Sequence, residues 1–241
     1  ENNNNKLRIC VLMWYNDGIK NYADMCYKIT SNYCKKYGYD IVKSSKVRLE
    51  NRKPHFERLP LILELIEKYD YVIWIDADAH FYIDSPPIHT VINAYKDSEF
   101  IFSGDLDRGD NGILEGDKDL HVINSGFMIL KNTKFVRDVI NEWAYSEDLY
   151  KRRTPAHFQD QGVIRLYLQE NINDIMEKSK VIPLGVLQNF SILENMKDKY
   201  ANVYKNYYDK FNLHKPYVIH YAGIDNETRI KLITEYYNKT S

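Results

Sequence analysis

Short apolar runs alternate with segments of helical spacing over the first 75 residues, and this alternation constrains the fold more than any other feature. The apolar runs cover residues 7–14, 39–42 and 71–75, and helical periodicity fills residues 20–37 and 56–69 between them. Gly38 follows the first helical segment, where a glycine commonly ends a helix. The order strand, helix, strand, helix, strand is typical of a parallel sheet with helices on both faces. The sequence therefore predicts an α/β fold with a mostly parallel central sheet.

The rest of the chain extends this pattern without a visible domain boundary. Further strands are predicted at residues 100–102, 126–130 and 216–219, and further helices at 133–146 and 161–170. Residues 104–121 are rich in glycine and aspartate and are expected to form a long surface loop, of the kind that often carries function. No linker or internal repeat interrupts the chain, so we predict one domain over residues 7–241, preceded by a disordered tail at residues 1–6.

The composition excludes some classes of function. The chain has 33 basic and 34 acidic residues, without the basic excess that a nucleic-acid-binding domain needs. Its three cysteines form no CxxC pair, which argues against a disulfide framework or a zinc site and favours a reducing compartment. No apolar stretch approaches the roughly 20 residues that cross a bilayer. We expect no membrane span in this fragment and a cytoplasmic location, with the Golgi lumen as the alternative if an N-terminal anchor was lost.

An acidic tripeptide follows the most apolar predicted strand. Asp76-Ala77-Asp78 comes directly after YVIWI, at the carboxyl end of a strand, where open α/β sheets bind their ligands. Two carboxylates separated by one residue can converge on one hard cation, with water and ligand oxygens completing its shell. Mn²⁺ or Mg²⁺ at such a site would neutralise a nucleotide diphosphate as a leaving group. The structural alternative is two aspartates that end a strand in a turn, and the apolar context favours the functional interpretation.

Four blocks of the chain resemble, in the same order, the galactosyl/xylosyl/mannosyltransferase family (family 34), which includes plant xyloglucan xylosyltransferases and yeast α-mannan transferases. The blocks are HFERLPL at 55–61 with WIDADA at 74–79, NSGFMI at 124–129, QDQ at 159–161 and HYAG at 220–223. The resemblance implies a GT-A fold, which is Rossmann-like with helices on both faces of the sheet. The third block usually reads DDQ in the family, and the glutamine at 159 leaves the identity of the donor sugar open.

The resemblance implies a metal site of three residues. In such enzymes the two DxD acids and the histidine of the H-x-x-G block hold the ion, and these map onto Asp76, Asp78 and His220, with Mn²⁺ or Mg²⁺ as the cofactor. Imidazole suits Mn²⁺, and the apolar strand before His220 would return it to the same sheet edge. A lone histidine is more often structural, but the nearby Gly223 permits close backbone approach to a phosphate and favours the ligand role.

Three further residues are implied at the reaction centre. In related transferases the residue at the position of Asn124 forms hydrogen bonds near the reaction centre. The residue at the position of Asp160 contacts sugar hydroxyls, and the one at the position of Gln161 lies close to the anomeric carbon. Asp160 is also expected to cap the helix that Gln161 opens, and both roles can hold together. The sequence around Asn124 fits an ordinary turn equally well. Gln188-Asn189 falls where the family has a short polar block near the acceptor.

Two more residues are expected to contact the nucleotide. Arg58 lies on the helix before the DxD strand, and its guanidinium would pair well with a diphosphate, with a solvated helix residue as the alternative. Lys53 and His55 are weaker candidates nearby. Tyr15 leaves the first strand where GT-A folds hold the base and ribose, and it is expected to stack on uracil or guanine. The alternative for Tyr15 is an ordinary aromatic residue in a chain with 21 tyrosines.

Together these features predict a metal-dependent glycosyltransferase that moves a sugar from a nucleotide-sugar, with a UDP-sugar favoured, to a hydroxyl of a glycan or glycoconjugate. The family resembled retains the anomeric configuration, and no carboxylate is an obvious nucleophile, so we expect a front-face substitution. A glycogenin-like transferase (family 8) and a non-catalytic nucleotide-sugar-binding module stay as alternatives. A haloacid-dehalogenase-like phosphatase fits worse, because its DxD follows the first strand and a Thr or Val usually sits two residues later, where this chain has His80.

Overall fold

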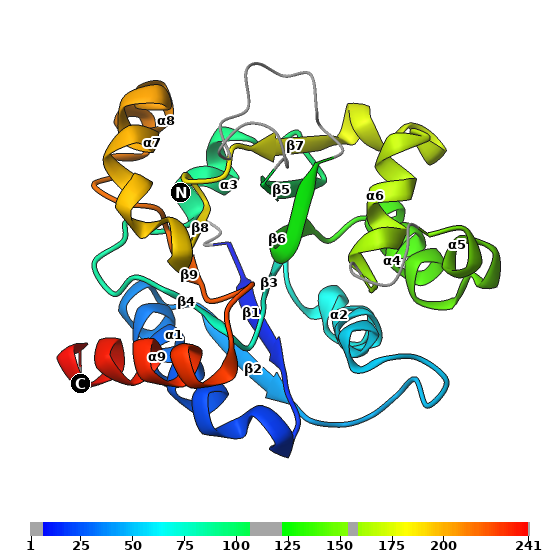
Figure 1. Ribbon diagram of the computed structural model, residues 1–241. Helices are drawn as coiled ribbons and strands as arrows, with labels where there is room; N and C mark the ends of the chain where they lie inside the picture. The colour runs from blue at the N-terminus through cyan, green and yellow to red at the C-terminus, as the bar shows by residue number, and fades with distance from the viewer. Residues whose placement is uncertain (1–6, 107–121, 154–158, 241) are drawn as a thin grey trace, which may run out of the picture.

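Two β-sheets form the centre of the molecule (Figure 1). The computed structural model describes residues 7–106, 122–153 and 159–240, and in these residues six strands form the main sheet and three form a small one. The main sheet has the order β2 (Asp40–Ser44), β1 (Ile9–Trp14), β3 (Tyr71–Ile75), β6 (Ile123–Lys131), β5 (Phe100–Gly104), β7 (Ser179–Ile182). The small sheet has the order β4 (Ala79–Phe81), β9 (Val218–His220), β8 (Gln188–Phe190). The predicted tail and most of the predicted loop at 104–121 lie outside the described residues.

Helices cover both faces of the main sheet (Figure 1). One face packs against the small sheet and against α1 (Lys20–Tyr37), α3 (His89–Ala94), α7 (Lys197–Val203), α8 (Lys205–Phe211) and α9 (Asn226–Thr240). The other face packs against α2 (Arg58–Leu65), α4 (Lys134–Tyr145), α5 (Glu147–Arg152) and α6 (Gln161–Gln169). Among the described helices, none combines the length and the apolar character needed to cross a bilayer. The α/β class with two covered faces is confirmed.

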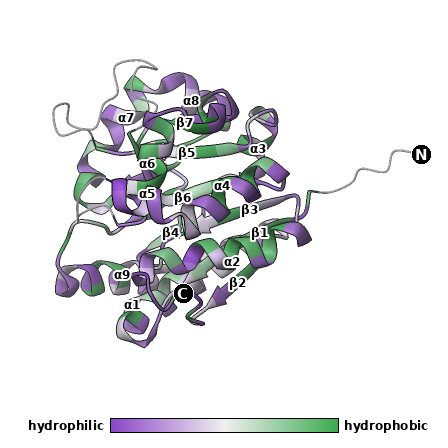
Figure 2. Cartoon of the chain, turned by 90° about the vertical axis from the view of Figure 1, so that its right-hand side faces the viewer, coloured by the Kyte–Doolittle hydropathy of each residue, from purple (hydrophilic) through white to green (hydrophobic). Residues whose placement is uncertain are grey.

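The central strands are buried on both faces, as their unbroken apolar runs predict. Along β1, Val11 and Met13 belong to one hydrophobic cluster, whereas Cys10 and Leu12 belong to the cluster on the opposite face. This division follows from the two-residue period of a strand. In Figure 2 the central strands are largely hydrophobic in colour, while the helices carry hydrophilic residues as well.

Local signals place the helix ends close to the predicted boundaries. The α1 helix ends at Gly38, which has a φ of 71°, a left-handed conformation that glycine adopts without a steric penalty. The α4 helix begins after Thr133, whose hydroxyl accepts a hydrogen bond from the backbone N–H of Val136. The predicted helix over 56–69 is divided, since 3-10 turns at Pro54–Glu57 and Ile66–Lys68 flank α2.

The main sheet is mixed because β6 runs against both of its neighbours. The β1–β2, β1–β3 and β5–β7 pairs are parallel, whereas β6 is antiparallel to β3 and to β5. Consequently the start of β6 lies beside the carboxyl end of β3, with Phe127 opposite Ile75. A parallel β6 would have placed its first residues at the far edge of the sheet.

The strand before His220 does not join the main sheet, which corrects the expectation for this element. It forms β9 of the small sheet and pairs with β4, the strand that begins directly after Asp78. In this pairing His220 lies opposite Ala79. The histidine therefore reaches the DxD segment through a second sheet that begins where β3 ends.

Candidate active site

A cleft opens where the two sheets meet. Its volume is about 1300 Å³, and it is lined by the ends of β1 and β3, the start of β6, and side chains from α2, α6 and α9. Asp76 and Asp78 line it together with His220, Asn124 and Arg58. This is the carboxyl edge of the parallel strands, where α/β sheets bind their ligands.

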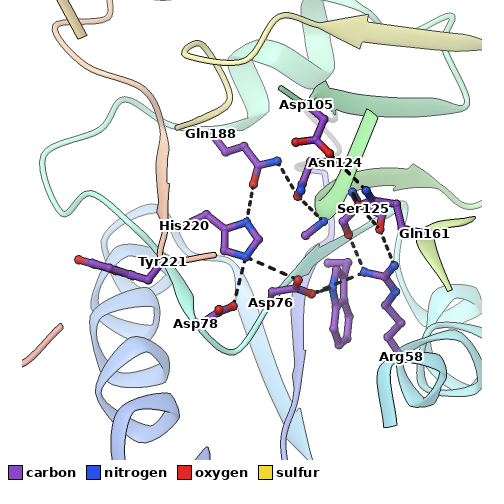
Figure 3. Close-up of polar contacts among 12 residues, drawn as sticks. Arg58, Asp76, Asp78, Asp105, Asn124, Ser125, Gln161, Gln188, His220 and Tyr221 are labelled. Carbon is purple, nitrogen blue, oxygen red and sulfur yellow. Dashed lines mark hydrogen bonds and ion pairs between the residues drawn. The ribbon is translucent and has the colours of Figure 1, made fainter. Parts of the chain in front are cut away.

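The three predicted metal ligands converge in this cleft. Asp76, Asp78 and His220 each offer one ligand atom, and these atoms all lie within 4.8 Å of one another. His220 Nε2 is 3.2 Å from an Asp78 carboxylate oxygen and 3.7 Å from one of Asp76 (Figure 3). Two carboxylates and one imidazole are a donor set that fits Mn²⁺. The residues present therefore fit the divalent cation that the resemblance implies.

Backbone hydrogen bonds hold the two acids of the DxD segment in place. The N–H of Asp76 donates to the carbonyl of Gly126 at 2.8 Å, and the N–H of Tyr221 donates to the carbonyl of Asp78 at 2.9 Å. The indole Nε1 of Trp74 also donates to the Asp76 carboxylate at 2.7 Å. Asp76 is thus tied to the main sheet and Asp78 to the small one.

Gly126 leaves the space that the site needs. A Cβ at this position would lie 2.4 Å from Cε1 of His220 and 2.9 Å from a carboxylate oxygen of Asp76. Separations this short are far inside van der Waals contact. The glycine of the NSG block is therefore required by packing against the candidate metal ligands, a reason that differs from the turn proposed from sequence.

Charges near the site oppose the effect of burial on its titrating groups. Burial alone would raise the pKa of Asp78, but His220 and the Arg229 guanidinium hold it below its ordinary value. Burial would lower the pKa of His220, and Asp78 together with Asp76 raises it instead. The site therefore stabilises positive charge at His220, as expected of a place built to hold a cation.

Two side-chain amides lie behind the imidazole. His220 Nδ1 is 3.2 Å from Oε1 of Gln188, whose Nε2 donates to Oδ1 of Asn124 at 3.0 Å. The same Asn124 oxygen accepts the backbone N–H of Gly126 at 2.9 Å. Figure 3 shows this chain running from β6 through β8 to His220. Asn124 lines the cleft, while Gln188 is fully buried behind it.

Asp160 does not cap helix α6, which corrects one of its two predicted roles. No backbone N–H of the helix bonds to its side chain, and the carboxylate instead pairs with the Arg58 guanidinium. Both residues are at least 95% buried, with 4% of Asp160 and 4% of Arg58 exposed. Burial raises the pKa of the Asp160 carboxyl, and Arg58 opposes that shift. A buried carboxylate needs a counter-ion, and this explains why the Asp160 side chain pairs with Arg58 and does not cap the helix.

Arg58 is engaged inside the protein on several sides. Its Nη1 and Nη2 donate to the carbonyl and hydroxyl of Ser125 at 2.6 Å each, and Nη1 lies 3.5 Å from the Asp76 carboxylate. The guanidinium also lies over the rings of Trp74 and Trp143. Arg58 borders the cleft, but its Nη1 and Nη2 donors are directed at protein groups. Its predicted contact with a diphosphate stays a prediction.

Gln161 borders the cleft at the start of α6, as predicted. Its Oε1 accepts the N–H of Ser125 at 2.8 Å, and its Nε2 donates to Asp105 at 3.3 Å. Asp105 also pairs with Arg165, and burial raises the pKa of Asp105 while Arg165 opposes the rise. A carboxylate and a cation from outside the predicted set thus belong to the same cleft.

The remaining candidates are placed differently. Tyr15 is 5% exposed, lies in the hydrophobic core and donates its hydroxyl to Asp24, and the described lining of the cleft contains its neighbours Trp14 and Asn16 instead. His55 borders the cleft, whereas Lys53 is exposed outside that lining. Gly223 lines the cleft with a φ of 75°, a backbone conformation that favours glycine.

Sequence reasoning missed Arg229. It lies on α9, and its Nε is 3.3 Å from an Asp78 carboxylate oxygen and donates to the carbonyl of Tyr221. Its Nη2 donates to the carbonyl of Ile224. The guanidinium thus joins Asp78 to the turn of the H-x-x-G block. Arg229 lies outside the four blocks that carry the resemblance, so the sequence contained no signal for this contact.

Comparison with known families identifies the chain. The model of the galactosyl transferase GMA12/MNN10 family matches residues 5–231. The chain belongs to this family. It is therefore a glycosyltransferase, as the ordered blocks predicted. No curated protein matches the chain by sequence similarity alone.

Solved structures of glycosyltransferases share the fold of this GMA12/MNN10 family member. A glycosyltransferase involved in the glycosylation of the major capsid of PBCV-1 superimposes with a TM-score of 0.66 at 14% identity, covering 95% of this chain and 99% of that chain. The galactosyltransferase LgtC, in complex with donor and acceptor sugar analogues, gives a TM-score of 0.59 at 15% identity over 95% of both chains. The bifunctional glycosyltransferase WbbM gives 0.56 at 16% identity, covering 96% of this chain and 50% of that one. The predicted GT-A fold is confirmed.

Proposed function

We propose that this glycosyltransferase transfers a sugar from a UDP-sugar to a hydroxyl of a glycan or glycoconjugate, depends on Mn²⁺ or Mg²⁺, and retains the anomeric configuration. The observation that carries the proposal is the convergence of Asp76, Asp78 and His220 in a cleft of about 1300 Å³. A cleft of this size has room for a nucleotide-sugar together with part of an acceptor. A divalent cation, when bound, neutralises the diphosphate and stabilises it as a leaving group.

The ion pairing of the aspartates in the cleft supports a front-face substitution. Each aspartate that lines the described part of the cleft pairs with an arginine or a histidine. The four aspartates are Asp76, Asp78, Asp105 and Asp160. A carboxylate nucleophile would have to leave such a pair before it attacked the sugar. In the proposed reaction the acceptor hydroxyl attacks from the side of the departing phosphate, whose oxygen takes the acceptor's proton.

The chain's own residues would orient the donor. Gln161 is held by the backbone of Ser125 at the edge of the cleft, and Asp105 lies beside it. An amide and a carboxylate fixed in this way are suited to hydrogen-bonding sugar hydroxyls. Among the described residues, no heavy atom beyond its chain neighbours lies within 4 Å of the position that a Cβ on Gly223 would take, so the backbone there is open to the cleft and can approach a phosphate.

Nucleotide release from a panel of UDP- and GDP-sugars tests the proposal. We expect release from a UDP-sugar with Mn²⁺ or Mg²⁺, loss of release in EDTA, and loss in Asp78→Asn at full metal concentration. Proton NMR of the first product formed reports its anomeric configuration, and an inverted product would overturn the retaining mechanism. Binding of a nucleotide-sugar without turnover would instead identify a non-catalytic binding module.

A further inference from the structure

We propose that two amides behind the metal site, those of Gln188 and Asn124, hold the His220 imidazole in the one tautomer that binds a cation. In this tautomer Nδ1 carries the hydrogen, and Nε2 presents its lone pair to the space beside Asp76 and Asp78. The proposal deepens the proposed function and rests on its metal site. It assigns Gln188 and Asn124 as positioning residues, which act on the cation through the histidine.

The backbone of β6 fixes which atom of the Asn124 amide is the acceptor. The backbone N–H of Gly126 is a donor only, and the Asn124 side-chain atom 2.9 Å from it must therefore be an acceptor. This contact assigns that atom as Oδ1, because the amide nitrogen could not accept the hydrogen bond. The orientation of the Asn124 amide is thus set by the backbone of β6.

The polarity of Asn124 determines the orientation of Gln188. The Asn124 oxygen lies 3.0 Å from the Gln188 amide, so Gln188 has to present its NH₂ group there. Its carbonyl oxygen then faces Nδ1 of His220 at 3.2 Å. Reversing the Gln188 amide would set two oxygens against each other, and Gln188 is 0% exposed, so no solvent compensates the loss.

The carbonyl of Gln188 in turn determines the histidine. An amide oxygen accepts hydrogen bonds and cannot donate one, so Nδ1 must carry a hydrogen. The neutral imidazole then has its lone pair on Nε2, which lies 3.2 Å from an Asp78 oxygen and 3.7 Å from an Asp76 oxygen. Without a positive charge, that lone pair would face two carboxylates, an unfavourable arrangement that a divalent cation turns into coordination.

Such outer hydrogen bonds matter for metal affinity because they fix the ring and increase the basicity of the ligating nitrogen. Loss of one commonly weakens metal binding by about 10-fold to 100-fold. The oxygen of Asn124 accepts hydrogen bonds from both Gly126 and Gln188. The expected contact of Asn124 near the reaction centre stays a prediction.

Mn²⁺ affinity measured by electron paramagnetic resonance, without any donor sugar, tests the proposal. We expect Gln188→Met, which keeps the side-chain length but removes the acceptor, to bind Mn²⁺ about 10-fold or more weakly. Asn124→Leu should show a similar loss, because Gln188 is then free to reverse, and Asn124→Asp should retain affinity because it keeps the acceptor. Asn189→Leu is the matched control for Mn²⁺ affinity, since it removes a buried amide of the same strand that donates to the carbonyl of Leu193 and not to His220.

A spectroscopic measurement reads the tautomer directly. Cadmium-113 is a diamagnetic substitute for Mn²⁺, and its coupling to nitrogen-15 in labelled histidine identifies the ligating atom. In wild-type protein we expect coupling to Nε2 of His220 and a hydrogen retained on Nδ1. Coordination through Nδ1, or a loaded ring with its hydrogen on Nε2, would overturn the proposal.

The possible failures are distinguishable. If the wild-type protein shows no Mn²⁺ or Cd²⁺ binding that depends on Asp78, the metal-dependent function and this inference are both refuted. Asp78→Asn identifies the binding that depends on Asp78. Wild-type binding that is unchanged in both Gln188→Met and Asn124→Leu would refute the inference alone. Thermal unfolding of each variant shows whether it is folded, and Asn124→Leu carries the test if Gln188→Met does not fold.

Discussion

Gly126 has no side chain, and the space this leaves is occupied by groups of the candidate metal site. Three atoms would lie within 2.9 Å of an added Cβ, including Cε1 of His220 and a carboxylate oxygen of Asp76. Neither can retreat easily, because His220 is 3% exposed and Asp76 is bonded to Trp74. A methyl group at this position therefore has to displace the side chain of His220 or Asp76, or shift the strand itself.

We predict that Gly126→Ala weakens Mn²⁺ binding by at least about 10-fold, comparable to loss of an outer hydrogen bond. Isothermal titration with MnCl₂ measures this. The far-ultraviolet circular dichroism should stay that of the wild type, since the strand itself accepts alanine. Wild-type affinity in this variant would show that His220 and Asp76 move freely, and the packing argument would then be wrong.

At the scale of elements, the Arg58–Asp160 pair joins α2 to α6 beneath the cleft. The two side chains are 4% and 5% exposed, so removal of Arg58 leaves the buried Asp160 carboxylate without solvent or its counter-ion. Hydrogen bonds from Arg58 to Ser125 extend the connection to β6. The floor of the cleft thus depends on three elements that meet at one guanidinium.

We predict that Arg58→Met lowers the free energy of unfolding by about 3–5 kcal/mol, because Asp160 is left buried and unpaired. Urea denaturation without nucleotide measures this loss of unfolding free energy. Because no diphosphate is present, the measurement does not include any effect of Arg58 on nucleotide binding. The double variant Arg58→Met with Asp160→Leu should recover a large part of it, since an apolar pair of similar size needs no counter-charge. An Arg58→Met protein as stable as the wild type would contradict this interpretation.

The sequence predicts some elements and contacts but not others, for physical reasons. An unbroken apolar run identifies β3 and so places Asp76 and Asp78 at a strand end, but a buried strand has no feature that indicates its direction, and the reversal of β6 was therefore not predicted. The three-residue strands β4 and β8 are too short for any periodicity. The contact between Gln188 and Asn124 joins positions 64 residues apart, and it depends on tertiary packing.

For the molecule as a whole, a buried histidine makes stability depend on pH. His80 is fully buried in the small sheet, with Nδ1 bonded to the carbonyl of Phe81 and Nε2 to the hydroxyl of Tyr221. Burial lowers its pKa from the ordinary 6.5 to about 4. The unfolded chain therefore takes up a proton near pH 6.5, while the folded protein resists it down to about pH 4. Folded stability is lost as the pH falls through this window.

We predict that the stability difference between wild type and His80→Phe shrinks by about 2 kcal/mol between pH 7 and pH 4.5. The phenylalanine variant loses two hydrogen bonds and is less stable at pH 7, but it has no proton to take up on unfolding. Urea denaturation of both proteins at a series of pH values in EDTA gives the difference, in which the other titrating groups cancel. A difference that stays constant over this range would show that His80 titrates normally in the folded state.

Ala77 lies between the two acids of the DxD segment, at the point where the chain passes from the main sheet to the small sheet. Asp76 is bonded to β6 of the main sheet, while the backbone carbonyl of Asp78 is bonded to Tyr221, next to the end of β9. The packing of Phe81 in β4 against Phe127 in β6 aligns one sheet on the other, with their ring centres 5.6 Å apart. The affinity for an ion bound by both Asp76 and Asp78 would therefore depend on how the two sheets are aligned. Substitutions in the core between the sheets would then change ion affinity, even where they touch none of the residues that bind the ion.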